Sequence, residues 1–344
     1  MLALKVKLKD AEKWKQYILV NDIIDKEYSY LKDKEHIYFP LQREFTILRP
    51  KELSFVDKEF PKTIKKGTLR ENLEKSLSEE EMFFVKTAHD TIGNIAILEI
   101  PKDLEKREKL IAETLLKSNS QIKTVLKKAN IHEGVFRTQK MIYLAGIDTK
   151  ETIYKENNVR LKLGVEKVYF SVRLSNERKR IMQLVFPNEE ILVMFSGCAP
   201  YPIVLSKNTK AKNILGIEIN PDGHKYGLEN VKLNRVKNVE LICGDVHKVI
   251  PELKKKSPKL TFDRIIMPLP KTADEFLDDA LAVSKKGTII HFYDFLELGK
   301  FEEAHIKIEK ACKKRKIKYK ILETVKCGQH SPYVYRICVD FKIM

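Results

Sequence analysis

Four apolar runs between residues 191 and 270 each end in small, acidic or proline residues. The first, ILVMF, leads into the turn SGCAP (196–200), and the second, NILGIEI, ends beside Glu218. The third, VELIC, is followed by Asp245, and the fourth, FDRIIM, leads into PLPK (268–271). Apolar runs of this length, separated by helical stretches, predict a parallel α/β sheet. Its four strand ends would share one edge, which is where open α/β sheets bind nucleosides.

Mixed, shorter patterns before this region predict two smaller α+β units. Residues 1–50 combine alternating apolar and charged positions with a helical stretch at 10–24, and hairpin-like strands are expected around Leu31–His36. The polar stretch 49–75 has the composition of a linker. The second unit is expected to contain a helix from Leu104 to about Ser118. Its strands are expected at 94–100, at 122–129, in MIYLAG and in ETIYKENNVRLKLG.

The chain is therefore expected to be an α/β protein of three domains. The boundaries that the pattern favours are 1–55, 70–166 and 167–344. The third domain starts with a helix and the first sheet strand, in NERKRIMQLVFPNEEILVMF. It ends in a basic helix and two strands that we expect to pair as an antiparallel ribbon.

Charge points to a polyanionic partner. Lys and Arg number 65 against 48 Asp and Glu, a net charge of +17. Nucleic acid is the leading candidate. A lysine-rich composition could instead reflect an AT-rich or heat-adapted source, which explains high charge better than it explains the imbalance.

Other features of composition favour a cytoplasmic protein without membrane or metal sites. The amino terminus carries charge too early for a signal peptide, and no apolar run approaches a membrane span. The five cysteines lack C-x-x-C spacing, so neither a disulfide framework nor a zinc site is expected. Cys198 lies in the first turn, but a nucleophilic role would need a nearby base.

The strand ends predict a particular cofactor. Gly197 allows close backbone approach, and Glu218, 21 residues further on, would accept hydrogen bonds from ribose hydroxyls. Asp245 would receive an adenine amine, with the Val246 amide facing a ring nitrogen. Neither G-x-x-x-x-G-K-[ST] nor G-x-G-x-x-G is present, which argues against ATP, GTP and NAD. S-adenosylmethionine is the remaining common adenosine ligand without a pyrophosphate.

A polar segment precedes the sheet, KVYFSVRLSNERKRI (167–181). Glu177 beside arginines could accept a proton while an arginine holds a phosphate, a carboxylate or a base edge. On physical grounds alone, a glutamate that favours the first turn of a helix is the simpler explanation.

These motifs together resemble the archaeal and eukaryotic type of tRNA (guanine-37-N1) methyltransferase, over nearly the whole chain. The motifs that carry the resemblance are GVFRTQ (134–139), KVYFSVRLSNERKRI (167–181), FSGCAPYPI (195–203), GIEINP (216–221), GDV (244–246) and MPLPK (267–271). The resemblance implies a class I (Rossmann-like) methyltransferase domain that uses S-adenosylmethionine. It also implies a small first domain that contacts the outer corner of tRNA, a middle domain that helps hold the anticodon loop, and a monomer.

The resemblance also implies roles for individual residues. Glu177 would remove the N1 proton of guanine, Arg137 would stabilise charge on the guanine oxygen, and Tyr169 would contact the methyl donor or the base. The implied cofactor-binding residues are Arg178, Phe195, Gly197, Glu218, Ile219, Asp245, Val246 and Pro268. The implied substrate-binding residues are Arg173, Asn176 and Pro270.

This sequence departs from the family pattern at several positions. Val172 replaces a proline, Cys198 and Ala199 alter the first turn and are expected to crowd the methionine end of the cofactor, and Pro268 replaces an asparagine. The last change occurs in archaeal relatives that also act on the tricyclic wyosine base. Two alternatives therefore stay open: a wyosine-pathway transferase that moves a methyl or aminocarboxypropyl group, possibly bifunctional, and a non-catalytic RNA-binding relative.

Overall fold

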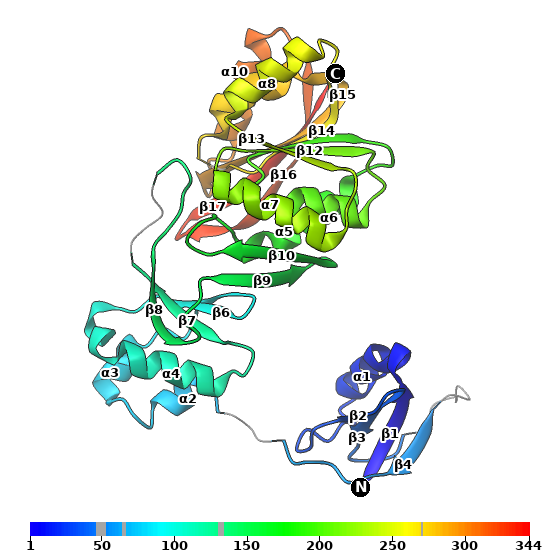
Figure 1. The fold of residues 1–344 in the computed structure, drawn as a ribbon, viewed down its shortest axis with the longest axis vertical. Helices are drawn as coiled ribbons and strands as arrows, with labels where there is room; N and C mark the ends of the chain where they lie inside the picture. Colours follow the sequence, from blue (N-terminus) through cyan, green and yellow to red (C-terminus); the bar gives the residue numbers. More distant parts are fainter. Residues whose placement is uncertain (46–52, 64–66, 130–133, 270) are drawn as a thin grey trace. The chain divides into compact units, whose positions relative to one another are not determined.

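The chain forms two compact units, Met1–Gly67 and Thr68–Met344, each with its own core (Figure 1). The computed structural model describes residues 1–45, 53–63, 67–129, 134–269 and 271–344. No helix in these ranges is long and apolar enough to cross a bilayer.

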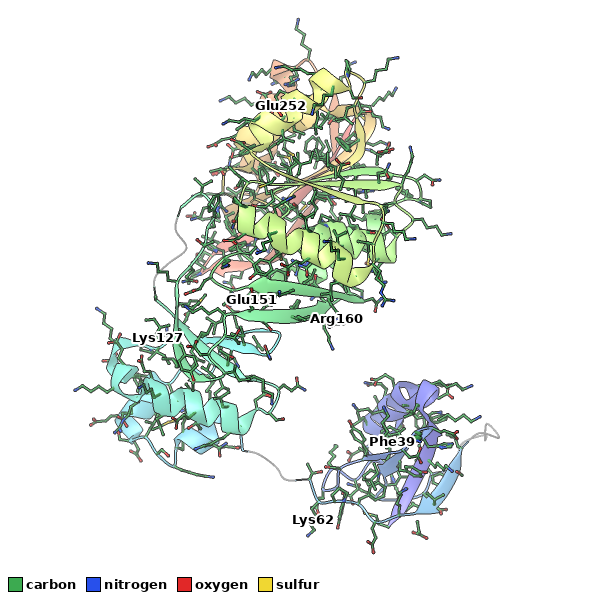
Figure 2. All side chains as sticks on the ribbon, in the orientation of Figure 1. Phe39, Lys62, Lys127, Glu151, Arg160 and Glu252 are labelled. Atoms are coloured by element: carbon green, nitrogen blue, oxygen red, sulfur yellow. The ribbon has the colours of Figure 1, made fainter. Side chains whose placement is uncertain are left out.

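The first unit is an antiparallel sheet covered by one long helix. The sheet has the order β2-β3-β1-β4, and Trp14, Ile18 and Phe39 pack in its core, so the single tryptophan has a packing role (Figure 2). Its elements are β1 (Leu2–Lys7), η1 (Leu8–Asp10), α1 (Ala11–Val20), β2 (Leu31–Lys32), β3 (His36–Pro40) and β4 (Ser54–Asp57).

The second unit begins with a smaller α+β layer. Its sheet has the order β5-β6-β7-β8, and α4 connects the parallel strands β6 and β7 while packing on β7 and β8. Capping boxes at Thr68–Glu71 and Ser78–Glu81 start its first two helices. The elements are α2 (Leu69–Leu73), α3 (Glu79–Phe84), β5 (Asp90–Ile92), β6 (Ile95–Leu98), η2 (Lys102–Arg107), α4 (Glu108–Ser118), β7 (Thr124–Lys128) and β8 (Met141–Gly146).

A two-stranded hairpin, β9 (Glu151–Glu156) and β10 (Val159–Gly164), follows where one strand was expected. That prediction was wrong because the chain turns at Asn157 and Asn158, both with positive φ, as in a tight hairpin turn. The free edge of β10 is hydrogen-bonded by side chains of α7. Asn230 Oδ1 accepts from the Lys162 amide at 2.6 Å, and Asn234 Oδ1 from the Arg160 amide at 2.8 Å.

The largest layer is a seven-stranded sheet in the order β13-β12-β11-β14-β15-β17-β16. Neighbours from β13 to β15 are parallel, whereas β17 pairs antiparallel with β15 and β16 as the expected terminal ribbon. The strands are β11 (Glu190–Met194), β12 (Asn213–Glu218), β13 (Val239–Cys243), β14 (Phe262–Met267), β15 (Ser284–Glu297), β16 (Tyr319–Ser331) and β17 (Val334–Ile343).

Helices cover both faces of this sheet (Figure 1). Side chains of α5 and α6 form one core with it, and those of α8, α9 and α10 form another on the opposite face. This confirms the expected fold class, a Rossmann-like α/β domain after two smaller α+β units. The helices are η3 (Val172–Leu174), α5 (Ser175–Leu184), α6 (Pro200–Asn208), α7 (Pro221–Asn234), α8 (Val246–Lys256), η4 (Ala273–Phe276), α9 (Leu277–Ala282) and α10 (Glu302–Lys314).

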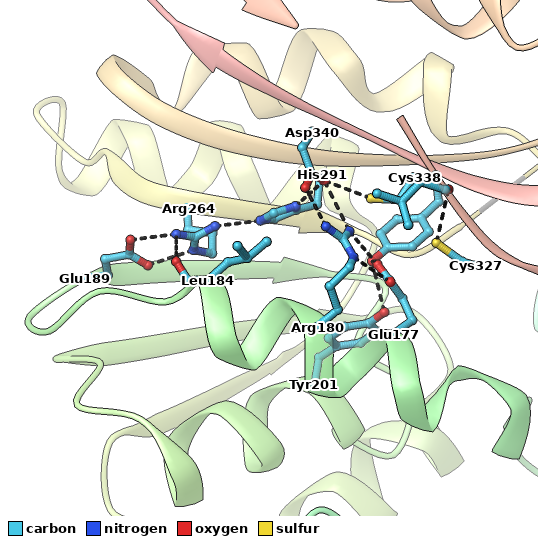
Figure 3. Close-up of polar contacts among 12 residues, drawn as sticks. Glu177, Arg180, Leu184, Glu189, Tyr201, Arg264, His291, Cys327, Cys338 and Asp340 are labelled. Carbon is cyan, nitrogen blue, oxygen red and sulfur yellow. Dashed lines mark hydrogen bonds and ion pairs between the residues drawn. The ribbon is translucent and has the colours of Figure 1, made fainter. Parts of the chain in front are cut away.

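A chain of buried charged groups crosses the middle of this domain (Figure 3). Arg264 on β14 pairs with both oxygens of Glu189 and donates from Nη1 to His291 Nε2 at 2.7 Å. His291 Nδ1 lies 2.6 Å from an oxygen of Asp340, which also accepts from Arg180. Because a guanidinium can only donate, His291 Nε2 must accept, so this imidazole is neutral and carries its proton on Nδ1.

His291, Cys338 and Asp340 also bring metal-ligating atoms within 4.8 Å of one another. The guanidinium groups of Arg264 and Arg180 already occupy acceptors of His291 and Asp340. Two adjacent positive charges oppose a metal cation, so this cluster is better explained as a structural network.

The neutral His291 predicts a pH-dependent loss of stability. Burial lowers the pKa of His291 from its ordinary value of 6.5, so the unfolded chain binds this proton at a higher pH than the folded chain does. Stability therefore decreases as the pH falls below about 6.5. In His291→Asn we expect a smaller decrease between pH 7.5 and pH 5.5, on top of an overall loss of about 1–3 kcal/mol.

Urea unfolding followed by far-ultraviolet circular dichroism measures this difference. Tryptophan fluorescence would not serve, because the single Trp14 lies in the other unit. Equal pH dependence in the wild type and in His291→Asn would contradict the assignment of a neutral histidine.

Candidate active site

The carboxyl ends of four parallel strands bring most predicted cofactor residues to one sheet edge. The strands β13, β12, β11 and β14 are adjacent and parallel, so their carboxyl ends meet. The groups that follow these ends are Phe195, Gly197, Glu218, Ile219, Asp245, Val246 and Pro268.

Glu218 is held in place by backbone amides. Its Oε2 accepts from the Gly197 amide at 2.5 Å, and its Oε1 accepts from the Asn220 amide at 2.8 Å. Burial raises the pKa of this carboxyl, while the amide hydrogen bonds act in the opposite direction. The carboxylate is thereby fixed against the Gly197 turn, as a ribose acceptor at this edge requires.

Asp245 lies at the start of the next helix. Its Oδ1 accepts from the His247 amide at 2.9 Å and so caps α8, while the Val246 side chain is buried. Ile219, which directly follows β12, is 37% exposed and presents a large apolar side chain to solvent. Phe195, with φ of 60°, packs edge-on against Phe276 at 4.7 Å.

The first turn packs its unusual side chains inward. Gly197 has φ of 56°, and a Cβ built on it would meet nothing closer than the Tyr169 carbonyl at 3.9 Å. Cys198 and Ala199 are 1% and 0% exposed, in apolar clusters with residues of the β9–β10 hairpin. These two side chains therefore do not produce the expected crowding. Burial raises the pKa of Cys198 to about 12, which also makes a nucleophilic thiolate unfavourable.

A cavity of about 540 Å³ lies between the smaller α+β layer and the large sheet, within the second unit. Arg137, Tyr169 and Arg173 all line it, so the structure brings these three predicted residues together. Burial lowers the pKa of Arg137, although a guanidinium stays charged at neutral pH. Arg173 is mostly exposed and donates to Asp90 at 2.8 Å.

Glu177 is buried outside the lining of this cavity, on α5 (Figure 3). Arg180 donates to both of its oxygens at 2.8 Å, and the Tyr293 hydroxyl donates to Oε1 at 2.5 Å. The neighbouring Asn176 is exposed. The Glu177 carboxylate is therefore held in a fixed orientation and already accepts hydrogen bonds from Arg180 and Tyr293.

Arg178 has different surroundings from those expected. Arg178 is 2% exposed, and its guanidinium forms a buried bidentate ion pair with Glu156 of β9. This ion pair joins α5 to the β9–β10 hairpin. We propose that Arg178 has this structural role and does not contact the cofactor. Pro268 is half-buried directly after β14, and Pro270 lies outside the described residues.

Several cavity residues escaped the sequence-based prediction. Arg336, Phe295 and His330 come from the terminal ribbon and β15. Lys271 is the last residue of the quoted MPLPK motif, but no role was assigned to it. The run CGQHSPYVYR (327–336) interrupts the apolar pattern of the ribbon with polar groups and could have served as a signal.

Comparison with known proteins agrees with this architecture. Three family models match consecutive parts of the chain: the tRNA methyltransferase 5 N-terminal domain (3–47), the TYW2 N-terminal domain (69–149) and the TRM5/TYW2 methyltransferase domain (152–322). A solved structure described as the complex of aTrm5 and tRNALeu matches all of both chains, at 32% identity and a TM-score of 0.70.

Two curated relatives are similar in sequence. The tRNA (guanine(37)-N(1))-methyltransferase Trm5b of Pyrococcus abyssi is 35% identical over 99% of each chain. The tRNA (guanine(37)-N(1))/4-demethylwyosine(37)-methyltransferase Taw22 of Nanoarchaeum equitans is 38% identical over 63% of this chain and 86% of its own. On this similarity and on the fold, the chain belongs to the TRM5/TYW2 methyltransferase family.

Proposed function

We propose that this protein transfers the methyl group of S-adenosylmethionine to N1 of guanosine 37 in tRNA. The observation that carries the proposal is the adjacency of two sites within the second unit. The amide-fixed Glu218 and the helix-capping Asp245 form a nucleoside edge, and the cavity with Arg137 and Tyr169 adjoins it at the Gly197 turn.

Each group has a chemical task in this reaction. Glu218 accepts hydrogen bonds from the ribose hydroxyls of the methyl donor, and Asp245 accepts one from the adenine amine. Ile219 packs against the adenine ring. Arg137 stabilises negative charge on the guanine oxygen, which makes the N1 proton easier to remove. The guanine reaches the cavity by leaving its stack, at a modest cost in a tRNA loop.

Glu177 is the proposed proton acceptor. Arg180 and Tyr293 hold its carboxylate outside the cavity lining, so proton transfer requires a contact between Glu177 and the base to form as the base enters. Catalytic contacts often become short only in the reactive complex, so this geometry is compatible with the role. Arg180 and Tyr293 would then act by orienting the carboxylate.

The net charge of +17 supports tRNA as the polyanionic partner. We propose that the unit Met1–Gly67 contacts the outer corner of tRNA, that the layer following it helps hold the anticodon loop, and that the protein acts as a monomer in the cytoplasm.

A second candidate activity is methylation of a wyosine precursor at the same tRNA position. The observation that favours it is Pro268, which places no hydrogen-bonding side chain after β14, where the family pattern has an asparagine. The relative from Nanoarchaeum equitans carries both activities in its name.

The proposed substrate is tested with tRNA transcripts that differ only at position 37. A transcript with guanosine 37 should accept a methyl group from labelled S-adenosylmethionine, and transcripts with adenosine or another base there should not. Equal methylation of both would exclude guanosine 37 as the target.

The proposed base is tested by Glu177→Gln, which keeps the shape of the side chain and removes its charge. We expect kcat to fall about 100-fold or more, because general base catalysis contributes about 10²–10⁴-fold. The KM values for donor and tRNA should change little. Steady-state methylation kinetics measure both quantities.

Two variants serve as comparisons for Glu177→Gln. Glu218→Gln should instead raise the KM for S-adenosylmethionine, because it weakens the ribose acceptor. Glu252→Gln changes an exposed acid on α8 (Figure 2) and should behave as the wild type. If Glu177→Gln retained the wild-type kcat, or lost only thermal stability, Glu177 would be a structural residue.

A further inference from the structure

Arg336 is a buried cation in the wall of the cavity. It lies on β17, is 9% exposed, and lines the same space as Arg137 and Tyr169. Neither the apolar pattern of the ribbon nor the proposed mechanism uses it. A charged side chain buried to this degree normally has a counter-ion.

The described residues give Arg336 neutral partners. Its Nη2 donates to the Tyr169 hydroxyl at 2.9 Å, and its guanidinium carbon lies 4.9 Å from the centre of the Phe295 ring. Its Nε is buried and has no hydrogen-bond partner among the described residues. No carboxylate of the described residues lies within 4.0 Å of the Arg336 guanidinium. Arg178, Arg180 and Arg264, by contrast, each form an ion pair with a carboxylate.

The rest of the cavity lining adds positive charge. Arg137 and Lys271 share the lining with Arg336. Its two carboxylates are both engaged, Asp90 by Arg173 and Glu99 by Lys128. Burial and the nearby cations Lys271 and Arg336 lower the pKa of His330, as expected where positive groups gather. Among the described residues, the lining thus has more cations than carboxylates, and an anionic ligand would balance this difference.

We propose that Arg336 is an anion-binding residue of this cavity, where its guanidinium binds an anionic oxygen group of a bound substrate. This inference rests on the proposed function, which supplies two such groups. One is a phosphate beside the target nucleotide, and the other is the carboxylate of the methionine part of the methyl donor. Both match the geometry in which arginine donates two hydrogen bonds.

The position of Tyr169 allows either source. Its hydroxyl accepts a hydrogen bond from Arg336, while its backbone carbonyl oxygen would lie 3.9 Å from a Cβ added to Gly197 in the first turn. Tyr169 therefore connects Arg336 to the proposed donor site at the Gly197 turn. Arg336 itself lies on the wall of the cavity.

Binding measurements with Arg336→Gln and Arg336→Lys test the proposal. Affinities are measured for guanosine-37 tRNA, for S-adenosylmethionine and for methylthioadenosine, which lacks the carboxylate. A lost phosphate contact should weaken tRNA binding about 10-fold and reduce its salt dependence. A lost carboxylate contact should weaken S-adenosylmethionine binding about 10-fold and leave methylthioadenosine unchanged. Arg336→Lys keeps the charge but not the paired donors, so it should recover only part of either loss.

The control is Lys255→Gln, which removes one positive charge from the exposed carboxyl-terminal end of α8. Arg336→Gln affinities equal to those of the control for all three ligands would overturn the proposal. So would a loss of methylthioadenosine binding, since it would show that Arg336 supports the fold. These assays require no turnover, so a failure of the proposed methylation would be seen separately, in the transcript assay.

Discussion

The guanidinium of Arg180 joins the first helix of the large domain to its last strand. It binds Glu177 on α5 at 2.8 Å and Asp340 on β17 at 2.6 Å, and both carboxylates are almost fully buried. Buried charges are tolerated only when their hydrogen bonds are complete, so neither element can shift without exposing an unpaired charge. The position of α5, and with it that of Glu177, therefore depends on a strand 160 residues further along the chain.

This constraint explains how the site is divided along the sequence. The middle of the domain, from β11 to β14, supplies the nucleoside edge with Glu218 and Asp245. The segment before α5 and the terminal ribbon supply the cavity groups Tyr169, Arg173 and Arg336. Arg180 connects α5 to the terminal ribbon. The cavity that these two segments line therefore forms only when the terminal ribbon has joined the sheet.

The meeting of Glu218 and Asp245 at one sheet edge could be predicted from the sequence, because it depends on local pattern. Apolar runs define the strands, and parallel strands bring their ends together whatever the rest of the chain does. Buried ion pairs could not be predicted in this way. Arg178 next to Glu177 had the pattern of a site residue, yet its partner Glu156 is set by the β9–β10 hairpin, whose turn the sequence pattern missed. Arg336 went unnoticed because its role depends on contacts with Tyr169 and Phe295, far away in sequence.

The identity of the product nucleoside tests the account most directly. Wild-type protein is incubated with guanosine-37 tRNA and labelled S-adenosylmethionine, and the digested tRNA is analysed by liquid chromatography and mass spectrometry. The proposed roles of Arg137 and Glu177 predict 1-methylguanosine from position 37. A methyl group on another atom of that guanine, transfer of an aminocarboxypropyl group, or no product despite tight binding of both ligands would contradict the account.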